Sequence, residues 1–393
     1  MATFFQKRML LKGLLSGATA YTGPFHAMID VTRRCNLRCV GCRFHSPEVH
    51  RSSPADPSVQ DMSWEVFENL CRQLHAAGTR VLFLMGEGEP LLHPDIFRMI
   101  ALVKDLGFQV TVISNGTLVD EAVANRLITA GTDVLQVSLW ALTEEDYAGQ
   151  YPGTDPQNFH RVLQGLHGLG LEKRRRDSIL PRVILHHPIN RPNMHGIEAI
   201  ADLASQAGCH GISLSPFLSL QGRNRALLPS GEEERQLGIR LRALKRSLRR
   251  RGLTENIDTV LKRYAYVPLE RKTAACYAGW FHARVRVDGT FVPCGSCDIA
   301  LGQAGSQSFA EVWNGPAYRR FRRRARTYKG LLDLRAKEGD CNYCCYTQDN
   351  LRIERWVGGW LALWLLLRDK FTHTDGDILG CRDSGRDGRE RPQ

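Results

Sequence analysis

Three cysteines spaced as CxxxCxxC, at Cys35, Cys39 and Cys42, constrain this chain more than any other feature. They follow directly after an apolar, strand-like segment at residues 26–32. Three thiols this close together can converge on one side of a loop, but a structural zinc site normally closes with four protein ligands. Thiolates are also the protein ligands of iron–sulfur clusters. The absence of a local fourth ligand favours a cubane cluster with one iron left open for another molecule.

Strand-like and helix-like segments alternate from residue 26 to about residue 220. Repeated β–α units imply a parallel sheet with right-handed crossovers, and six units are too few for a complete eight-stranded barrel. We therefore predict a partial (β/α)6 TIM-like barrel, although periodicity alone leaves a doubly wound sheet open. The predicted strands are 26–32, 80–85, 108–114, 134–139, 181–187 and 211–216, and the predicted helices are 63–77, 94–106, 119–130, 156–169 and 195–207.

A second group of cysteines lies near the carboxyl terminus. Cys276 and Cys294 enclose the pattern CX12GX4C, whose glycine is Gly289, and Cys341 and Cys344 form a CX2C pair. Residues 285–292 around Asp288-Gly289 predict a β-hairpin, which would bring the first two cysteines to neighbouring ends of a small ribbon. Four cysteines can complete an iron–sulfur cluster or a zinc site, and spacing alone does not choose between them.

The chain has 12 cysteines among 393 residues, and most of them are clustered. Because disulfides are rare in reducing compartments, clustered cysteines favour a cytoplasmic, metal-binding protein over a secreted one. The net charge of +12 would suit an anionic partner. However, the main basic run at 240–251 carries leucines at helical spacing and no interleaved aromatic residues. We therefore predict a helix that buries its leucine face and exposes its basic face to solvent. No nucleic-acid partner is expected.

The pattern divides the chain into five segments. They are an amphipathic amino-terminal segment (1–25), a core barrel (26–225), a basic helical linker (226–275), a small cysteine-rich domain (276–348), and an apolar helix with a disordered tail (349–393). The apolar run at 356–367 is too short to span a bilayer, which takes about 20 residues. Its three tryptophans suit a membrane interface, whereas its glycine pair suits docking as a buried helix. The basic, amphipathic start of the chain favours peripheral contact with the inner membrane face.

The loop Gly86-Glu87-Gly88-Glu89-Pro90 follows the second predicted strand, at the same end of the sheet as the cysteine loop. Together, the two motifs make residues 26–221 resemble the radical S-adenosylmethionine (SAM) superfamily. The resemblance implies that Cys35, Cys39 and Cys42 hold a [4Fe–4S] cluster whose open iron chelates the amino and carboxylate groups of SAM. It also implies SAM contacts from Gly88, Glu89, Pro90, Ser114, Asn115 and Ser138, with Glu89 meeting the methionine amino group.

Two residues depart from the pattern of that family. The residue before the third cysteine is usually bulky, but here it is Gly41, which suggests that another side chain such as Phe44 packs the adenine. The first glycine of the family's GGEP loop is Glu87.

Residues 276–348 resemble the SPASM/twitch auxiliary-cluster domain, and Phe309–Trp313 resembles its usual helix. The resemblance implies one auxiliary [4Fe–4S] cluster on Cys276, Cys294, Cys341 and Cys344. A full SPASM domain continues the pattern with further cysteines, but Asn350 and Glu354 stand at the next positions. Cys297 and Cys345 could substitute as ligands.

The resemblance implies an enzyme that reductively cleaves SAM to a 5′-deoxyadenosyl radical, which abstracts a substrate hydrogen. The auxiliary cluster would aid oxidation or modification of a peptide, a sugar or aminocyclitol, or a lipid-linked substrate. A reducing partner such as flavodoxin or ferredoxin is implied as well. The alternative is a zinc-binding regulatory or nucleic-acid-binding protein with structural metals, in which the 86–90 loop has no role.

Overall fold

The computed structural model describes residues 4–47, 58–217, 224–264, 275–327, 329–331, 333–334, 344 and 346–372. For residue 263 and residues 360–372, only the backbone is described. The chain forms two compact units, Met1–Asn350 and Leu351–Gln393. Every contact discussed below lies within the first unit.

Six parallel strands form the core of the sheet. They are β1 (His26–Asp30), β2 (Val81–Met85), β3 (Gln109–Ser114), β4 (Val134–Ser138), β5 (Arg182–Ile189) and β6 (Gly211–Pro216). Each pairs with its neighbour in the sequence, in the order β6-β5-β4-β3-β2-β1. A doubly wound sheet would reverse this order at a switch point. The unbroken order therefore confirms the partial barrel and excludes the doubly wound alternative.

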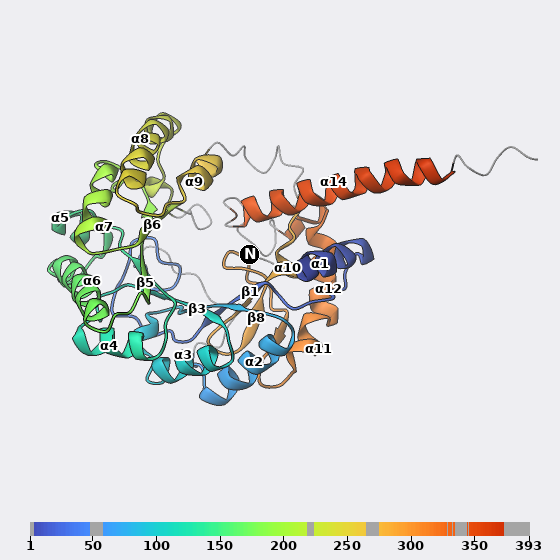
Figure 1. Cartoon of the computed structure of the whole chain (residues 1–393), viewed down its shortest axis with the longest axis horizontal. Helices are drawn as coiled ribbons and strands as arrows, with labels where there is room; N and C mark the ends of the chain where they lie inside the picture. The colour runs from blue at the N-terminus through green and yellow to red at the C-terminus, as the bar shows by residue number, and fades with distance from the viewer. Residues whose placement is uncertain are drawn as a thin grey trace, which may run out of the picture. The chain divides into compact units, whose positions relative to one another are not determined.

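Helices cover the outer side of these strands (Figure 1). They are α2 (Trp64–Ala76), α3 (Ile96–Asp105), α4 (Glu121–Thr129), α6 (Asn158–Arg175) and α7 (Ile200–Gln206), with short 3-10 turns at Pro90–Leu92, Ile197–Ala199 and Arg225–Leu227. All five occur where helices were predicted. A further helix, α5 (Glu144–Gln150), was not predicted; the Thr143 hydroxyl caps it by accepting from the Asp146 amide at 3.0 Å. Its sequence is too short and too acidic to show a clear apolar period.

The basic linker contains two helices, α8 (Gly231–Arg250) and α9 (Ile257–Tyr264). Gly252 separates them with a φ of +70°, a left-handed conformation that favours glycine. The helix α8 buries its leucine stripe, as its spacing predicts, and exposes its basic face. The four buried leucines are Leu237, Leu241, Leu244 and Leu248.

The cysteine-rich region extends the same sheet. Strand β7 (His282–Val285) pairs with β1 in parallel, and β8 (Thr290–Val292) and β9 (Gly302–Gln303) continue it in antiparallel fashion. The predicted hairpin is confirmed, with Gly289 at a φ of +88° in its turn. Short helices follow or precede the ribbon: α10 (Ala278–Phe281), α11 (Phe309–Trp313) and α12 (Pro316–Ala325). The carboxyl ends of β1 and β7 therefore lie next to each other.

The amino-terminal segment forms the helix α1 (Phe4–Ser16), which buries Leu10 and Leu14. A side chain at Gly13 would come within 3.1 Å of the Trp280 ring of α10, so the glycine allows close packing there. The apolar run at 356–367 lies in the helix α14 (Thr347–Thr372). Among the helices that the structure describes, none is long and apolar enough to cross a membrane.

Candidate functional site

The first cysteine loop leaves the carboxyl end of β1, where the active sites of βα barrels are built. Cys35, Cys39 and Cys42 are partly buried and form no disulfide. The loop is closed by a hydrogen bond from the Cys42 amide to the Cys39 carbonyl at 2.9 Å. The amides of Phe44 and His45 donate to the Cys42 sulfur at 3.4 and 3.3 Å. Such donors stabilise a thiolate that is bound to iron.

The three thiols lie close enough to perturb one another. Burial raises the pKa of Cys35 to about 11, and the negative charges of Glu89 and Cys42 contribute to the rise. Burial also raises the pKa of Cys39, with contributions from Cys42 and Cys35. Three buried thiols beside a carboxylate favour binding of a cationic group, because thiolates there are otherwise destabilised. This donor set fits an iron–sulfur cluster.

The 86–90 loop packs directly on the cysteine loop. The Gly88 amide donates to the Thr32 carbonyl at 2.9 Å, and the Glu89 amide donates to the Arg34 carbonyl at 2.8 Å. A Cβ atom on Gly88 would lie 2.2 Å from the Arg34 carbonyl oxygen. Glycine is therefore required here by the close approach of two backbones. Pro90 is buried and begins the 3-10 turn that follows.

Glu89 points its carboxylate toward the ends of the strands. Its Oε1 accepts from the Ser114 hydroxyl at 2.8 Å and the Leu91 amide at 3.1 Å, and its Oε2 accepts from the Asn115 amide at 2.6 Å. Burial raises the pKa of Glu89 to about 7. A carboxylate can accept about four hydrogen bonds, so these three leave capacity for one more donor. The structure thus brings Glu89, Ser114 and Asn115 together with the cysteines.

Ser138 ends β4 and belongs to a polar chain that crosses the strand ends. Its hydroxyl accepts from the Trp140 indole N–H at 3.1 Å and lies 3.4 Å from His186 Nδ1. His186 Nε2 in turn lies 3.1 Å from the Ser215 hydroxyl at the end of β6. Of these residues, the sequence predicted a cofactor contact for Ser138 only. The positions of His186 and Ser215 at the ends of predicted strands were the available signal.

The structure gives a reason for Gly41. A Cβ atom there would lie 2.1 Å from the Phe217 ring and 2.9 Å from the Trp140 ring. These two rings meet edge to face, with centroids 5.9 Å apart. Aromatic side chains from the ends of β4 and β6 thus fill the space that a bulky residue 41 would need. Phe44 was predicted to pack the adenine in place of a bulky residue 41. Its ring lies instead beneath the guanidinium of Arg286, whose Cζ atom is 5.3 Å from the Phe44 ring centroid.

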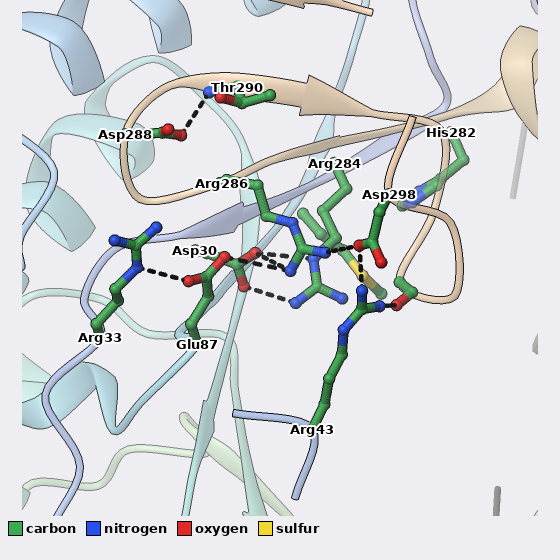
Figure 2. A network of polar contacts seen from close by, with 12 residues as sticks. Asp30, Arg33, Arg43, Glu87, His282, Arg284, Arg286, Asp288, Thr290 and Asp298 are labelled. Carbon is green, nitrogen blue, oxygen red and sulfur yellow. Dashed lines mark hydrogen bonds and ion pairs between the residues drawn. The ribbon is translucent and has the colours of Figure 1, made fainter. Parts of the chain in front are cut away.

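Glu87 has an equally specific environment. Its carboxylate is buried and pairs with Arg33 Nε at 2.7 Å and with Arg286 Nη1 at 3.3 Å. Arg286 follows β7, so Glu87 joins the barrel to the cysteine-rich region. Figure 2 shows that the network continues through Asp30, Arg284, Asp298 and Arg43. A glycine at position 87 would leave Arg286 without this partner.

The second cysteine group includes Cys276, before the β7–β8 hairpin, and Cys294, directly after it. Burial raises the pKa of Cys276, and the charges of Cys344, Cys294 and Cys297 raise it further. Cys297 is 4% exposed, and its backbone pairs with that of Cys294 in an isolated antiparallel β-bridge, while neither cysteine forms a disulfide. The described thiols therefore suit a second iron–sulfur cluster. Of the predicted ligands, Cys341 lies outside the described residues, as does Cys345.

Asn350 occupies the position where a full SPASM pattern has a further cysteine. Its amide nitrogen donates to the Cys344 sulfur at 4.0 Å, and its Oδ1 accepts from the Tyr277 amide at 2.8 Å. The asparagine thus links Cys344 to the residue after Cys276. The remaining described cysteines, Cys71 and Cys209, are buried, as expected for core residues.

Comparison with known proteins identifies both regions. Residues 29–204 match the radical SAM superfamily, and residues 276–346 match SPASM, an iron–sulfur cluster-binding domain. An AdoMet-dependent heme synthase from Methanosarcina barkeri is 27% identical over 336 residues, which cover 81% of this chain and 87% of that enzyme. A PqqA peptide cyclase from Granulibacter bethesdensis is 26% identical over 315 residues, 76% of each chain.

Two solved structures share the fold. Streptococcus suis SuiB bound to S-adenosylmethionine has a TM-score of 0.58 at 15% identity, and the match covers 80% of this chain and 71% of SuiB. Native anSMEcpe with bound AdoMet has a TM-score of 0.58 at 15% identity, covering 86% of this chain and 100% of that one. The zinc-binding alternative gains no support from any of these matches. The chain is an enzyme of the radical SAM superfamily that carries a SPASM auxiliary iron–sulfur domain.

Proposed function

We propose that Cys35, Cys39 and Cys42 hold the [4Fe–4S] cluster that binds SAM, and that Glu89 accepts a hydrogen bond from the methionine amino group. The observation that carries this proposal is that three partly buried cysteines and the Glu89 carboxylate lie close enough to act electrostatically on one another after β1 and β2. When bound, the reduced cluster and SAM supply a 5′-deoxyadenosyl radical that abstracts a hydrogen atom from the substrate.

The other residues of the site orient the cofactor. Ser114 and the Asn115 amide hold the Glu89 carboxylate in place and leave it capacity for a further donor. Gly88 and Pro90 keep the loop close to the cysteine loop. Ser138 presents its hydroxyl at the end of β4, beside the Trp140 ring. Trp140 and Phe217 take the packing role that a bulky residue 41 has in related enzymes.

The auxiliary cluster is proposed to bind Cys276, Cys294, Cys341 and Cys344. The mutual proximity of the three described members supports this set. When bound by these residues, the cluster would supply a one-electron acceptor near the substrate. Cys297 is buried beside this site and is the alternative fourth ligand.

The central experiment is anaerobic reconstitution of the full chain with iron and sulfide, followed by reduction with dithionite in the presence of SAM. We expect release of 5′-deoxyadenosine. Cys39→Ala removes a proposed ligand and should abolish the product, whereas Cys71→Ala alters a buried core cysteine and should not. A wild-type protein that binds about eight iron atoms but makes no 5′-deoxyadenosine would overturn the proposal.

The first candidate substrate is a peptide. Support comes from relatives whose names specify peptides: the PqqA peptide cyclases, and SuiB, which was solved with its precursor peptide SuiA. The second candidate is an iron porphyrin, favoured by the heme synthase, which this chain matches over 87% of that enzyme's length. Hydrogen transfer from a deuterated peptide or porphyrin into 5′-deoxyadenosine distinguishes the two.

We infer a reducing partner such as flavodoxin or ferredoxin. We also propose that the five segments of the chain meet at residues 25, 225, 275 and 348. Peripheral contact with an anionic membrane rests on the net charge of +12 and on three tryptophans in residues 356–367. Co-sedimentation with anionic vesicles tests it: equal partitioning with and without residues 350–393 would remove its basis.

A further inference from the structure

A buried charge network extends, through Arg43, from the loop of Cys42 to the loop of Cys294 (Figure 2). We call it the interloop network. It contains three carboxylates and four guanidiniums, from Asp30, Glu87, Asp298, Arg33, Arg43, Arg284 and Arg286. In this buried environment the charges of the guanidiniums are weakly screened.

Arg43 links the two loops directly. It is the residue after Cys42, and its guanidinium donates to the carbonyl of Gly295 and to the carboxylate of Asp298. Gly295 is the residue after Cys294. The Arg43 side chain is 9% exposed, so the bridge is largely shielded from water. One side chain thus spans from a proposed ligand of the first cluster to a proposed ligand of the second.

Arg284 brings a second positive charge to the same place. Its Nε and Nη2 donate to the two Asp30 oxygens, both at 2.8 Å. Its Nη1 lies 2.7 Å from the position that a Cβ atom on Gly295 would take, so the guanidinium rests against this backbone. Burial raises the pKa of the Cys294 thiol to about 11, and the positive charges of Arg284 and Arg43 oppose this rise.

We propose that Arg43 is a positioning residue that fixes the Cys294 loop to the Cys42 loop, and that Arg43 and Arg284 together raise the reduction potential of the auxiliary cluster. The inference rests on the proposed function, because it requires that cluster to be present. Reduction adds negative charge to a cluster, so nearby buried cations favour the reduced form. A cluster tuned in this way is a better acceptor for an electron from substrate.

The test is a redox titration of the reconstituted holoenzyme, followed by electron paramagnetic resonance with SAM present. SAM changes the signal of the cluster that it binds, which separates the two clusters. Arg43→Met removes the charge, and we expect about a tenfold fall in the reduced fraction at a fixed potential, or about 59 mV for one electron. Arg43→Lys keeps the charge and should recover most of this shift.

Asp298→Asn gives a change of opposite sign. It removes a carboxylate that faces Arg43 and Arg286, so the potential should rise. General disruption of the fold would not move the two variants in opposite directions, and thermal unfolding with iron content identifies a variant that fails to fold. A full second cluster with an unchanged potential in both Arg43→Met and Asp298→Asn would overturn this inference alone. A wild-type protein with only one cluster would overturn the proposed auxiliary site instead.

Discussion

Replacing Glu87 with glutamine should destabilise the folded protein much more than replacing an exposed glutamate. The Glu87 carboxylate lies 2.7 Å from Arg33 Nε and 3.3 Å from Arg286 Nη1, and the side chains of Glu87 and Arg286 are about 1% and 0% exposed. Even at an effective dielectric constant of 20, each contact corresponds to about 5–6 kcal/mol of Coulomb attraction before desolvation is subtracted. Removing one partner of a buried pair costs about 3–5 kcal/mol, because the remaining charge is left uncompensated.

Urea unfolding followed by circular dichroism measures this loss. Glu68→Gln is the matched control, since Glu68 pairs with Arg72 at the same 2.7 Å distance but on an exposed helix surface, where such pairs contribute little. The double variant Glu87→Gln/Arg286→Met removes both charges and should recover part of the stability. If Glu87→Gln unfolds at the same urea concentration as Glu68→Gln, the carboxylate does not stabilise the joint between barrel and SPASM domain as argued.

Three further predictions concern packing, pH and the auxiliary ligands. Gly41→Ala should lower both the affinity for SAM and the free energy of unfolding, because the new Cβ atom would clash with the Phe217 ring. The double variant Gly41→Ala/Phe217→Ala removes that ring and should restore the free energy of unfolding. Equal losses in the single and the double variant would contradict the clash. Burial lowers the pKa of His187 to about 4 from 6.5, so the unfolded chain binds a proton that the folded chain excludes between these values. Wild-type stability should therefore fall as the pH decreases from 7 to 5, by about 2 kcal/mol from this histidine, and His187→Gln should show a correspondingly smaller fall in urea titrations. Cys276→Ala should reduce bound iron from about eight to about four atoms per chain, whereas Cys297→Ala should leave it near eight; the reverse pattern would make Cys297 the ligand.

The barrel and the first site could be predicted from the sequence because their signals are local. Most strands of the barrel are apolar runs that follow a helix ending at a glycine, and strand ends in a parallel sheet meet at one edge. Cys35 and Glu89 follow such strands directly, so their convergence could be expected. The helix α5 could not, because seven residues with three adjacent acids give little periodicity.

The two departures from the family pattern show where local reading ends. Gly41 and Glu87 look like losses when only their own loops are considered. Their reasons lie in Phe217 and Arg286, which are far away in sequence and meet them only after the sheet has formed. Phe217 compensates for the small side chain at position 41, and Arg286 compensates for the charge at position 87. Compensation between residues so far apart in sequence leaves no short-range pattern. For the same reason, the ion pairs of the interloop network could not be predicted from the sequence, because they join residues from distant segments of the chain.

The pairing of β1 with β7 has a consequence for synthesis of the chain. Strand β1 pairs with β2 on one side and with β7 on the other, where His26 lies opposite His282. The ribosome must add about 250 residues after β1 before β7 is made, which takes some 13–50 s at ordinary translation rates. During that time one row of the amides and carbonyls of β1 faces solvent, as in any edge strand that invites pairing with other chains. A shortened chain that stops at residue 225 would keep this edge open permanently. The SPASM domain therefore also covers the β1 edge of the barrel sheet with β7. For this reason the barrel expressed alone should aggregate.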